Sequence, residues 1–193
     1  MSALREPRFT ETEYLALESA SQTKHEFYGG QIIAMSGASP THDDIVGNTF
    51  ASLHAQLRGG RCRVYTSDVR VKVAGPRSYF YPDIKVVCGA PDFNSDNPPC
   101  LLNPTLIIEV LSPSTADFDR GAKASAYRQL ESLQELLLIS QDSPRVERFV
   151  RQPDGQWLLG EIHGLDAVLE LRTIGCTLAL AEVYARVEFT DEA

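Results

Sequence analysis

The stretch that decides the fold is residues 106–130, LIIEVLSPSTADFDRGAKASAYRQL. Its first six residues are apolar except for Glu109, a pattern that predicts a strand buried on both faces. The SPST that follows breaks the strand, and we expect a helix to begin near Asp117 or Asp119. A strand followed directly by a helix is typical of folds that mix both elements in one domain.

Glu109 is the charged residue least expected inside this strand. An unpaired carboxylate in a buried strand is costly, so Glu109 must either pair with a cationic side chain or hold a cation. The helix offers Lys123, which shares one helical stripe with Tyr127, four residues further on. The sequence favours a buried Glu109–Lys123 ion pair without metal and a metal site equally.

A second carboxylate opens another apolar strand, within residues 79–89, YFYPDIKVVCG. Pro82 has no ladder donor, which restricts it to a strand start or an edge. Asp83 either begins this strand as an ordinary loop cap or lies at a strand end where its charge can be used. Carboxylates from two strands suit a hard cation such as Mg²⁺, and a nearby lysine can orient a water bound to it.

Length and composition indicate one soluble domain. The chain has 193 residues, 43% hydrophobic and 23% charged, and no stretch approaches the length of a membrane span. No signal peptide is indicated. The four cysteines form no CxxC pair, which favours reduced, partly buried thiols and a cytoplasmic location; they are Cys62, Cys88, Cys100 and Cys176.

The net charge of −8 argues against nucleic-acid binding through overall charge. Between residues 58 and 85, however, seven basic residues face two acidic ones, a local net of +5. This strip is either a solvated strand face or a surface that contacts phosphates. The residues that would contact phosphate in the second interpretation are Arg61, Arg63, Arg70 and Lys72.

The remaining pattern predicts an α+β, or mixed α/β, single domain spanning residues 1–193, with no internal repeat. We expect a helix at 10–20 with a Thr10–Glu13 capping box, a hairpin around Gly29 and Gly30, and a helix at 39–58 with an apolar stripe. The stripe comprises Val46, Phe50, Leu53 and Leu57. Strands are expected at 61–66, 69–73, 79–87 and 135–140, a hairpin at 145–162, and a frayed acidic tail.

Three stretches together resemble a known family. They are KHEFYGGQIIAMSGASPTH (24–42), YPDIKVVCG (81–89) and residues 106–130, in this order. The chain is similar, from about Tyr14 to Val150, to the large and mostly uncharacterised restriction-endonuclease family within the PD-(D/E)XK nuclease superfamily. The resemblance implies a restriction-endonuclease-like core, a central mixed β-sheet flanked by helices, with an N-terminal helix and hairpin.

The resemblance also implies roles for individual residues. Asp83 and Glu109 match the metal-binding acids, and Glu26 an additional ligand or orienting group. Lys123 matches the family's lysine, which has moved to the helix because Leu111 occupies the position usual in the superfamily. The supporting positions implied are His42, whose role is open, and Ser112, Asp119 and Tyr127.

This set implies an endonuclease that uses Mg²⁺ or Mn²⁺ to hydrolyse DNA, with a possible homodimer and no membrane partner. The chain departs from the family after the helix, where ESLQELLLIS has leucines in place of the usual aromatic residues. That departure and the acidic net charge leave an alternative open. The alternative is a non-catalytic nucleic-acid-binding or assembly protein built on a nuclease-like fold.

Overall fold

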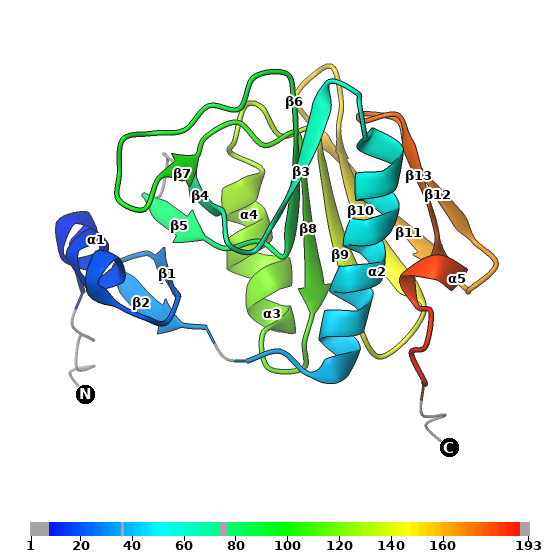
Figure 1. The fold of residues 1–193 in the computed structure, drawn as a ribbon, viewed down its shortest axis with the longest axis horizontal. Helices are drawn as coiled ribbons and strands as arrows, with labels where there is room; N and C mark the ends of the chain where they lie inside the picture. The colour runs from blue at the N-terminus through cyan, green and yellow to red at the C-terminus, as the bar shows by residue number, and fades with distance from the viewer. Residues whose placement is uncertain (1–7, 36, 74–76, 190–193) are drawn as a thin grey trace.

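The computed structural model describes residues 8–35, 37–73 and 77–189, and Figure 1 shows how their elements are arranged. The expected mixed α+β fold is confirmed. The helical elements are α1 (Glu11–Ala20), α2 (Pro40–Leu57), α3 (Ala116–Phe118), a π-helical turn η1 (Asp119–Lys123), α4 (Ala124–Tyr127) and α5 (Leu180–Val183).

A six-stranded mixed sheet forms the centre of the molecule, in the order β11-β10-β9-β8-β6-β3. Only β8 and β9 run parallel within it, and the other neighbours are antiparallel. Every residue of β8 and β9 is buried, as the continuous apolar runs predict. The strands are β3 (Cys62–Thr66), β6 (Ile84–Cys88), β8 (Leu106–Leu111), β9 (Glu135–Ser140), β10 (Arg145–Arg151) and β11 (Trp157–His163).

A second, five-stranded sheet has the order β2-β1-β5-β4-β7 and carries α1. Its strands are β1 (His25–Tyr28), β2 (Gln31–Ala34), β4 (Arg70–Val73), β5 (Ser78–Phe80) and β7 (Cys100–Leu101). The expected hairpin is confirmed, and Gly29 and Gly30 turn it with φ values of +59° and +87°. Tyr14 of α1 stacks on Phe27 of β1 with ring centroids 5.0 Å apart, which fixes α1 on this sheet.

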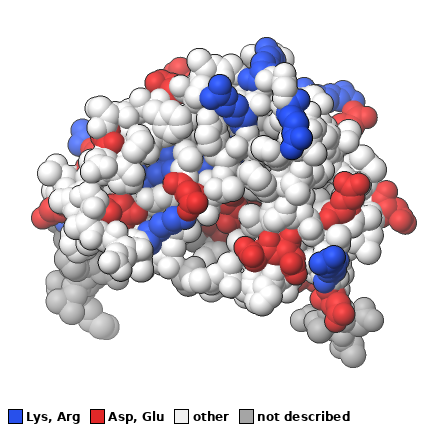
Figure 2. All heavy atoms as spheres, in the orientation of Figure 1, with Lys and Arg blue, Asp and Glu red and all other residues white. Residues whose placement is uncertain are grey.

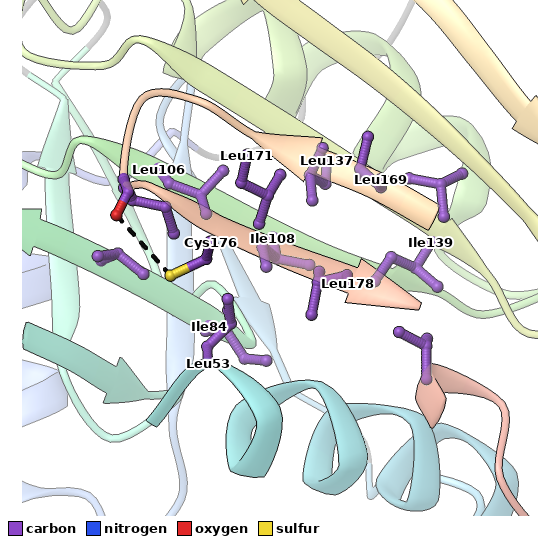
Figure 3. Packing of buried hydrophobic residues seen from close by; sticks show 14 of the residues in the cluster. Leu53, Ile84, Leu106, Ile108, Leu137, Ile139, Leu169, Leu171, Cys176 and Leu178 are labelled. Carbon is purple, nitrogen blue, oxygen red and sulfur yellow. Dashed lines mark hydrogen bonds between the residues drawn. The ribbon is translucent and has the colours of Figure 1, made fainter. Parts of the chain in front are cut away.

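Two apolar layers cover the central sheet. One face packs against α2, α5 and a hairpin of β12 (Val168–Leu171) and β13 (Cys176–Ala179). Figure 3 shows Leu53 of α2 and Leu178 of β13 converging on Ile108 of β8. The other face packs against the helical segment 116–127 and the inner side of the five-stranded sheet.

The helix start signals are confirmed, and one apolar stripe is confirmed in part. Thr10 and Glu13 form the capping box of α1, and Ser39 caps α2 by accepting a hydrogen bond from the His42 amide. In the stripe predicted for α2, Leu53 and Leu57 are buried in the core as expected. In its first half Ile45 and Thr49 are buried instead, while Val46 and Phe50 are only partly covered.

The strand predicted at residues 79–87 is two strands. β5 ends at Phe80 in the five-stranded sheet, and β6 starts at Ile84 in the central sheet. Pro82 and Asp83 lie in the crossing between the sheets, where Pro82 need not supply a ladder donor. Asp83 therefore precedes the first residue of β6, as expected for a carboxylate at a strand end.

The prediction that all four cysteines are reduced is wrong. Cys62 and Cys88 form a disulfide between β3 and β6, where the two residues are direct partners in the antiparallel register. Cys100 and Cys176 remain thiols and are buried. The two cysteines are 26 residues apart in the sequence, so no local pattern predicted their pairing. The pairing arises only from the register of the two strands.

Several elements escaped sequence interpretation. β7, β12, β13 and α5 were not identified from the sequence. The acidic tail expected beyond residue 189 lies outside the described residues. Within the part of the chain that the structure describes, no helix is long and apolar enough to cross a bilayer.

Candidate active site

One cavity of about 630 Å³ lies where the start of β6, the end of β8, the start of α2 and the segment 116–127 meet. Strand register brings these ends together, because β6 and β8 are antiparallel neighbours with Ile84 opposite Ile108. Asp83 and Glu109 are each the next residue along from that pair. The two strand carboxylates singled out in the sequence therefore enter the same cavity.

Asp83 is held by two neighbours. Its Oδ2 atom accepts a hydrogen bond of 2.7 Å from the backbone amide of Val110, in the adjacent strand. The same oxygen lies 3.3 Å from Nε2 of His42, in the first turn of α2. The carboxylate is fixed at the cavity wall by groups from two different elements.

Glu109 is almost fully buried, with 3% of its surface exposed. Its Oε1 atom accepts a 2.6 Å hydrogen bond from the Tyr127 hydroxyl and lies 3.0 Å from Nζ of Lys123. Burial raises the pKa of the Glu109 carboxyl to about 8, against the opposing attraction of Lys123. Burial and the neighbouring carboxylate likewise raise the pKa of Tyr127, so its hydroxyl keeps its proton and donates.

Lys123 lies at the centre of the acidic groups. Its Nζ atom is 3.0 Å from Oε1 of Glu26, 3.0 Å from Oε1 of Glu109 and 3.3 Å from Oδ1 of Asp119. Burial opposes its charge, but the surrounding carboxylates, Glu109 foremost, raise the pKa of Lys123 well above its ordinary value. The expected ion pair is thus a four-residue network, and Lys123 remains an ammonium within it.

Glu26 is buried rather than an exposed strand residue. It projects from the middle of β1, and its Oε1 atom accepts a 3.0 Å hydrogen bond from the backbone amide of Tyr81. That amide belongs to the crossing that leads to Asp83. The contact joins the five-stranded sheet to the cavity and explains how an early hairpin reaches the site.

The supporting residues divide into two groups. Asp119 and Tyr127 touch Lys123 and Glu109 directly, as described above. Ser112 lines the cavity, but its hydroxyl lies 2.9 Å from that of Thr115 and 3.1 Å from that of Ser114. It therefore orders the SPST turn and makes no contact with Lys123 among the hydrogen bonds of the described residues.

His42 contacts Asp83 in the site. Burial lowers the pKa of its imidazole, but the hydrogen bond and charge of Asp83, the Val110 backbone and the charge of Asp43 together more than offset this, and the net direction is upward. Its Nδ1 atom is buried and has no hydrogen-bond partner among the described residues. The geometry assigns His42 to the orientation of Asp83.

Lys85 lies beside the site but was not singled out from the sequence. Lys85 is fully buried, and its Nζ atom donates a 2.8 Å hydrogen bond to the carbonyl of Pro82. Burial lowers the pKa of its ammonium to about 7, although the charges of Glu109 and Asp83 oppose this. The signal in the sequence was a lysine inside the apolar run IKVV. This lysine was instead counted as part of the basic strip between residues 58 and 85.

The basic strip is not one surface. Arg70 is buried and donates to the Tyr14 hydroxyl and the Pro98 carbonyl, so its assignment as a phosphate contact is wrong. Lys72 is half-buried, and its Nζ atom lies 3.0 Å from a carboxylate oxygen of Glu11. Its charge is therefore paired within the protein. Both side chains hold α1 and the loop before β7 onto the five-stranded sheet.

Arg61 and Arg63 are exposed, but they lie at the far end of α2 from the cavity. The cavity takes its lining from the first turn of α2, and β3 follows its last turn. An 18-residue helix is about 27 Å long. These two arginines cannot touch the same phosphate as the cavity residues.

The cavity is acidic and its donors fit a hard cation by chemistry. Five acidic residues and two lysines line it, and Figure 2 shows acidic side chains in and around the recess on this face. Carboxylate oxygens are the ligands that Mg²⁺ and Mn²⁺ prefer. Among the described residues, no three acidic, histidine or cysteine side chains form a ready metal cluster, because Lys123 lies between Glu26 and Glu109.

Two carboxylates at the ends of neighbouring strands and a lysine on the following helix meet in one cavity, which is the set that the resemblance to a nuclease family implies. Comparison with known proteins shows the family. A model of the Uma2 family, described as "Putative restriction endonuclease", matches residues 12–181. The chain belongs to this family.

Two relatives come from Synechocystis sp. (strain ATCC 27184 / PCC 6803 / Kazusa). "Uncharacterized protein sll1609" is 40% identical over 161 residues, covering 83% of this chain and 91% of that protein. "Uncharacterized protein slr1290" is 34% identical over 183 residues, covering 95% of each.

A crystal structure of "a putative nuclease belonging to DUF820" from Anabaena variabilis ATCC 29413 is also similar. It matches with a TM-score of 0.75 and 17% identity, covering 91% of this chain and 97% of that one. At this identity the likeness establishes the fold.

Proposed function

We propose that the protein is a metal-dependent endonuclease that hydrolyses phosphodiester bonds in DNA. The observation that carries the proposal is the meeting in one cavity of Asp83, which precedes β6, with Glu109 of β8 and Lys123 of η1. Family membership supports the same reaction class. We also propose a cytoplasmic location, where DNA is accessible, and a homodimer, since cutting a duplex takes two sites or two visits.

Asp83, Glu109 and Glu26 are the residues that would hold Mg²⁺ or Mn²⁺. When bound, such a cation offsets charge on a phosphate and lowers the pKa of a coordinated water. The chain prepares these ligands itself, since the Val110 amide orients Asp83 and the Tyr127 hydroxyl orients Glu109. With five acidic residues against two lysines, the cavity repels a phosphodiester until that charge is balanced.

Lys123 supplies the positive charge closest to the reacting groups. In hydrolysis, a water oxygen forms a bond to phosphorus while the bond from phosphorus to the leaving sugar oxygen breaks. The water gives up a proton, and the leaving oxygen takes one. Lys123, held as an ammonium, would orient the water through hydrogen bonds and stabilise the negative charge that develops on the phosphoryl oxygens.

The test is nicking of supercoiled plasmid with Mg²⁺ or Mn²⁺. We compare the wild type with Asp83→Asn and Lys123→Met, and use Asp117→Asn as the matched control. Asp117 is an exposed acidic residue in the first turn of α3, outside the cavity lining. We expect cleavage to fall by about 100-fold or more in both site variants, by analogy with other groups that stabilise transition states, and to persist in the control.

Cleavage that survives in both site variants would contradict the assignment of the site. A folded wild type that cleaves nothing in either metal, yet binds DNA, would favour the alternative of a non-catalytic binding protein. Circular dichroism of each variant establishes that it is folded. A comparison of plasmid DNA with RNA of similar length tests the proposed choice of DNA.

A further inference from the structure

The residues proposed to hold a metal are engaged by the protein's own cation. Nζ of Lys123 lies 3.0 Å from Oε1 of Glu26 and 3.0 Å from Oε1 of Glu109. Both acids are also on the inner wall of the cavity, and all three side chains are at least 90% buried. An ion entering this site meets carboxylates that are already paired.

We propose that Lys123 is a resident counter-ion that a divalent cation must displace from Glu26 and Glu109, and that Asp119 retains Lys123 in the site when this exchange occurs. The inference rests on the proposed function, since it concerns the same metal. It adds that the lysine limits metal affinity as well as serving the reaction. The protein then keeps four acidic side chains together in the absence of metal.

The charges gathered in the cavity support this exchange. Four carboxylates (Glu26, Asp83, Glu109 and Asp119) line one cavity, and gathering them without a positive charge would be costly. Lys123 reduces that cost because a single ammonium contacts three of them. The same contacts oppose a divalent cation, since ammonium and metal seek the same oxygens.

The three carboxylates that contact Lys123 come from different elements of the fold. Glu26 and Glu109 come from β1 and β8, whereas Asp119 belongs to the same π-helical turn as Lys123. Its Oδ1 atom is 3.3 Å from Nζ, and the two residues move with one element. Asp119 is therefore the partner that Lys123 can keep when the strand carboxylates turn to another cation. In this role Asp119 is a positioning residue.

The experiment is titration of the DNA-free protein with Mn²⁺ by isothermal calorimetry. In Lys123→Met we expect the Mn²⁺ affinity to increase by at least about tenfold, although cleavage is lost. The matched control is Lys24→Met, which removes another cavity lysine. Nζ of Lys24 contacts the exposed Asp68, which does not line the cavity, so we expect the Mn²⁺ affinity of this variant to change by less than about threefold.

Asp119→Asn provides a second test with Lys123 in place. Without its carboxylate partner, Lys123 stays on the strand acids, and we expect the Mn²⁺ affinity to fall several-fold. This variant keeps a polar side chain of the same size, so it tests the inference even if Lys123→Met does not fold. Asp117→Asn, two residues away, exposed and outside the cavity lining, is its control and should bind Mn²⁺ as the wild type does.

The outcomes separate this inference from the proposed function. Folded Lys123→Met with an unchanged or weaker Mn²⁺ affinity would overturn the exchange, as would unchanged or tighter binding in Asp119→Asn. Wild type that binds Mn²⁺ and loses it in Asp83→Asn would still support the metal site in that case. Binding by Lys123→Met but not by wild type would support the exchange and contradict metal use by the native protein. No binding by either would overturn both.

Discussion

At the scale of single residues, burial shifts the pKa values of Glu109, in the candidate site, and Lys85, beside it, in opposite directions. It raises the pKa of the Glu109 carboxyl to about 8 and lowers the pKa of the Lys85 ammonium to about 7. Both shifts favour the uncharged form, since a charge is costly away from water. Three carboxylates surround Lys123 and raise its pKa, so Lys123 keeps its charge. Near neutral pH, the availability of Glu109 as a ligand therefore depends on pH.

Because burial raises the pKa of Glu109, we expect the Mn²⁺ affinity to rise with pH between about 6 and 9. A proton competes with Lys123 and with the metal for the Glu109 oxygens, and this competition weakens as the pH rises. Tyr127→Phe removes a hydrogen-bond donor that favours the carboxylate form of Glu109. The pKa of Glu109 should therefore rise further, and the curve of Mn²⁺ affinity against pH should move to higher pH. Calorimetric titration at several pH values measures this.

Tyr28→Phe is the control for that measurement. Tyr28 packs against Phe80 and Phe118 beside the same helical segment and is half-buried. Among the described residues its hydroxyl makes no hydrogen bond to Glu109 or Lys123. Its curve should overlay that of the wild type. Identical curves for wild type and Tyr127→Phe, or an affinity that declines as pH rises, would contradict the prediction.

At the scale of elements, local sequence signals were sufficient for some features and not for others. Capping residues, paired glycines and the apolar run at β8 act within a few residues, so α1, the β1–β2 hairpin and β8 were predicted. The pairing of Cys62 with Cys88 and the burial of Arg70 depend on contacts between distant segments. Alternation of charged and apolar residues could not distinguish a buried arginine from an exposed one.

The site shows the same division. Asp83 and Glu109 were identified because a charge in an apolar run stands out locally. Glu26 and His42 carried no such signal, and only family resemblance singled them out before the structure placed them. Lys85 stood out as strongly as Glu109 but lay among other basic residues, and its burial became evident only from the register of β6 with β8.

The disulfide between β3 and β6 should stabilise the fold without affecting the site. It closes a separation of 26 residues, for which restriction of the unfolded chain predicts about 3–4 kcal/mol. We expect reduction to lower the urea midpoint accordingly, while the Mn²⁺ affinity is unchanged, because Cys88 and Asp83 lie at opposite ends of β6. Urea unfolding with and without a phosphine reductant measures the first effect, and calorimetry the second.

The double variant Cys62→Ser/Cys88→Ser is the control, and its midpoint should be insensitive to the reductant. Quantitation of thiols in the denatured protein should find two without reductant and four with it, since Cys100 and Cys176 are thiols. Four thiols before reduction, or a midpoint that the reductant does not move, would contradict the disulfide's role.

At the scale of the whole molecule, two exposed arginines lie far from the cavity. Figure 2 shows lysine and arginine side chains along one edge of the face and others beside the acidic recess. The exposed residues Arg61 and Arg63 lie about 27 Å from the cavity end of α2, the length of that helix. Along DNA this distance corresponds to about eight base pairs. A duplex held in the cavity could therefore meet these arginines about eight base pairs from the scissile phosphate.

This geometry predicts a contribution that depends on DNA length. Arg61→Gln/Arg63→Gln should weaken binding of a duplex of about 24 base pairs and reduce its salt slope by about 2, since each phosphate contact contributes about 0.9. Binding of a six-base-pair duplex should not change. Fluorescence anisotropy with Ca²⁺ in place of Mg²⁺ measures binding, and Arg186→Gln, an exposed arginine after α5, is the matched control. An equal loss for both duplexes would place the arginines at the cavity's own phosphate, and no loss for either would exclude them from the DNA contact.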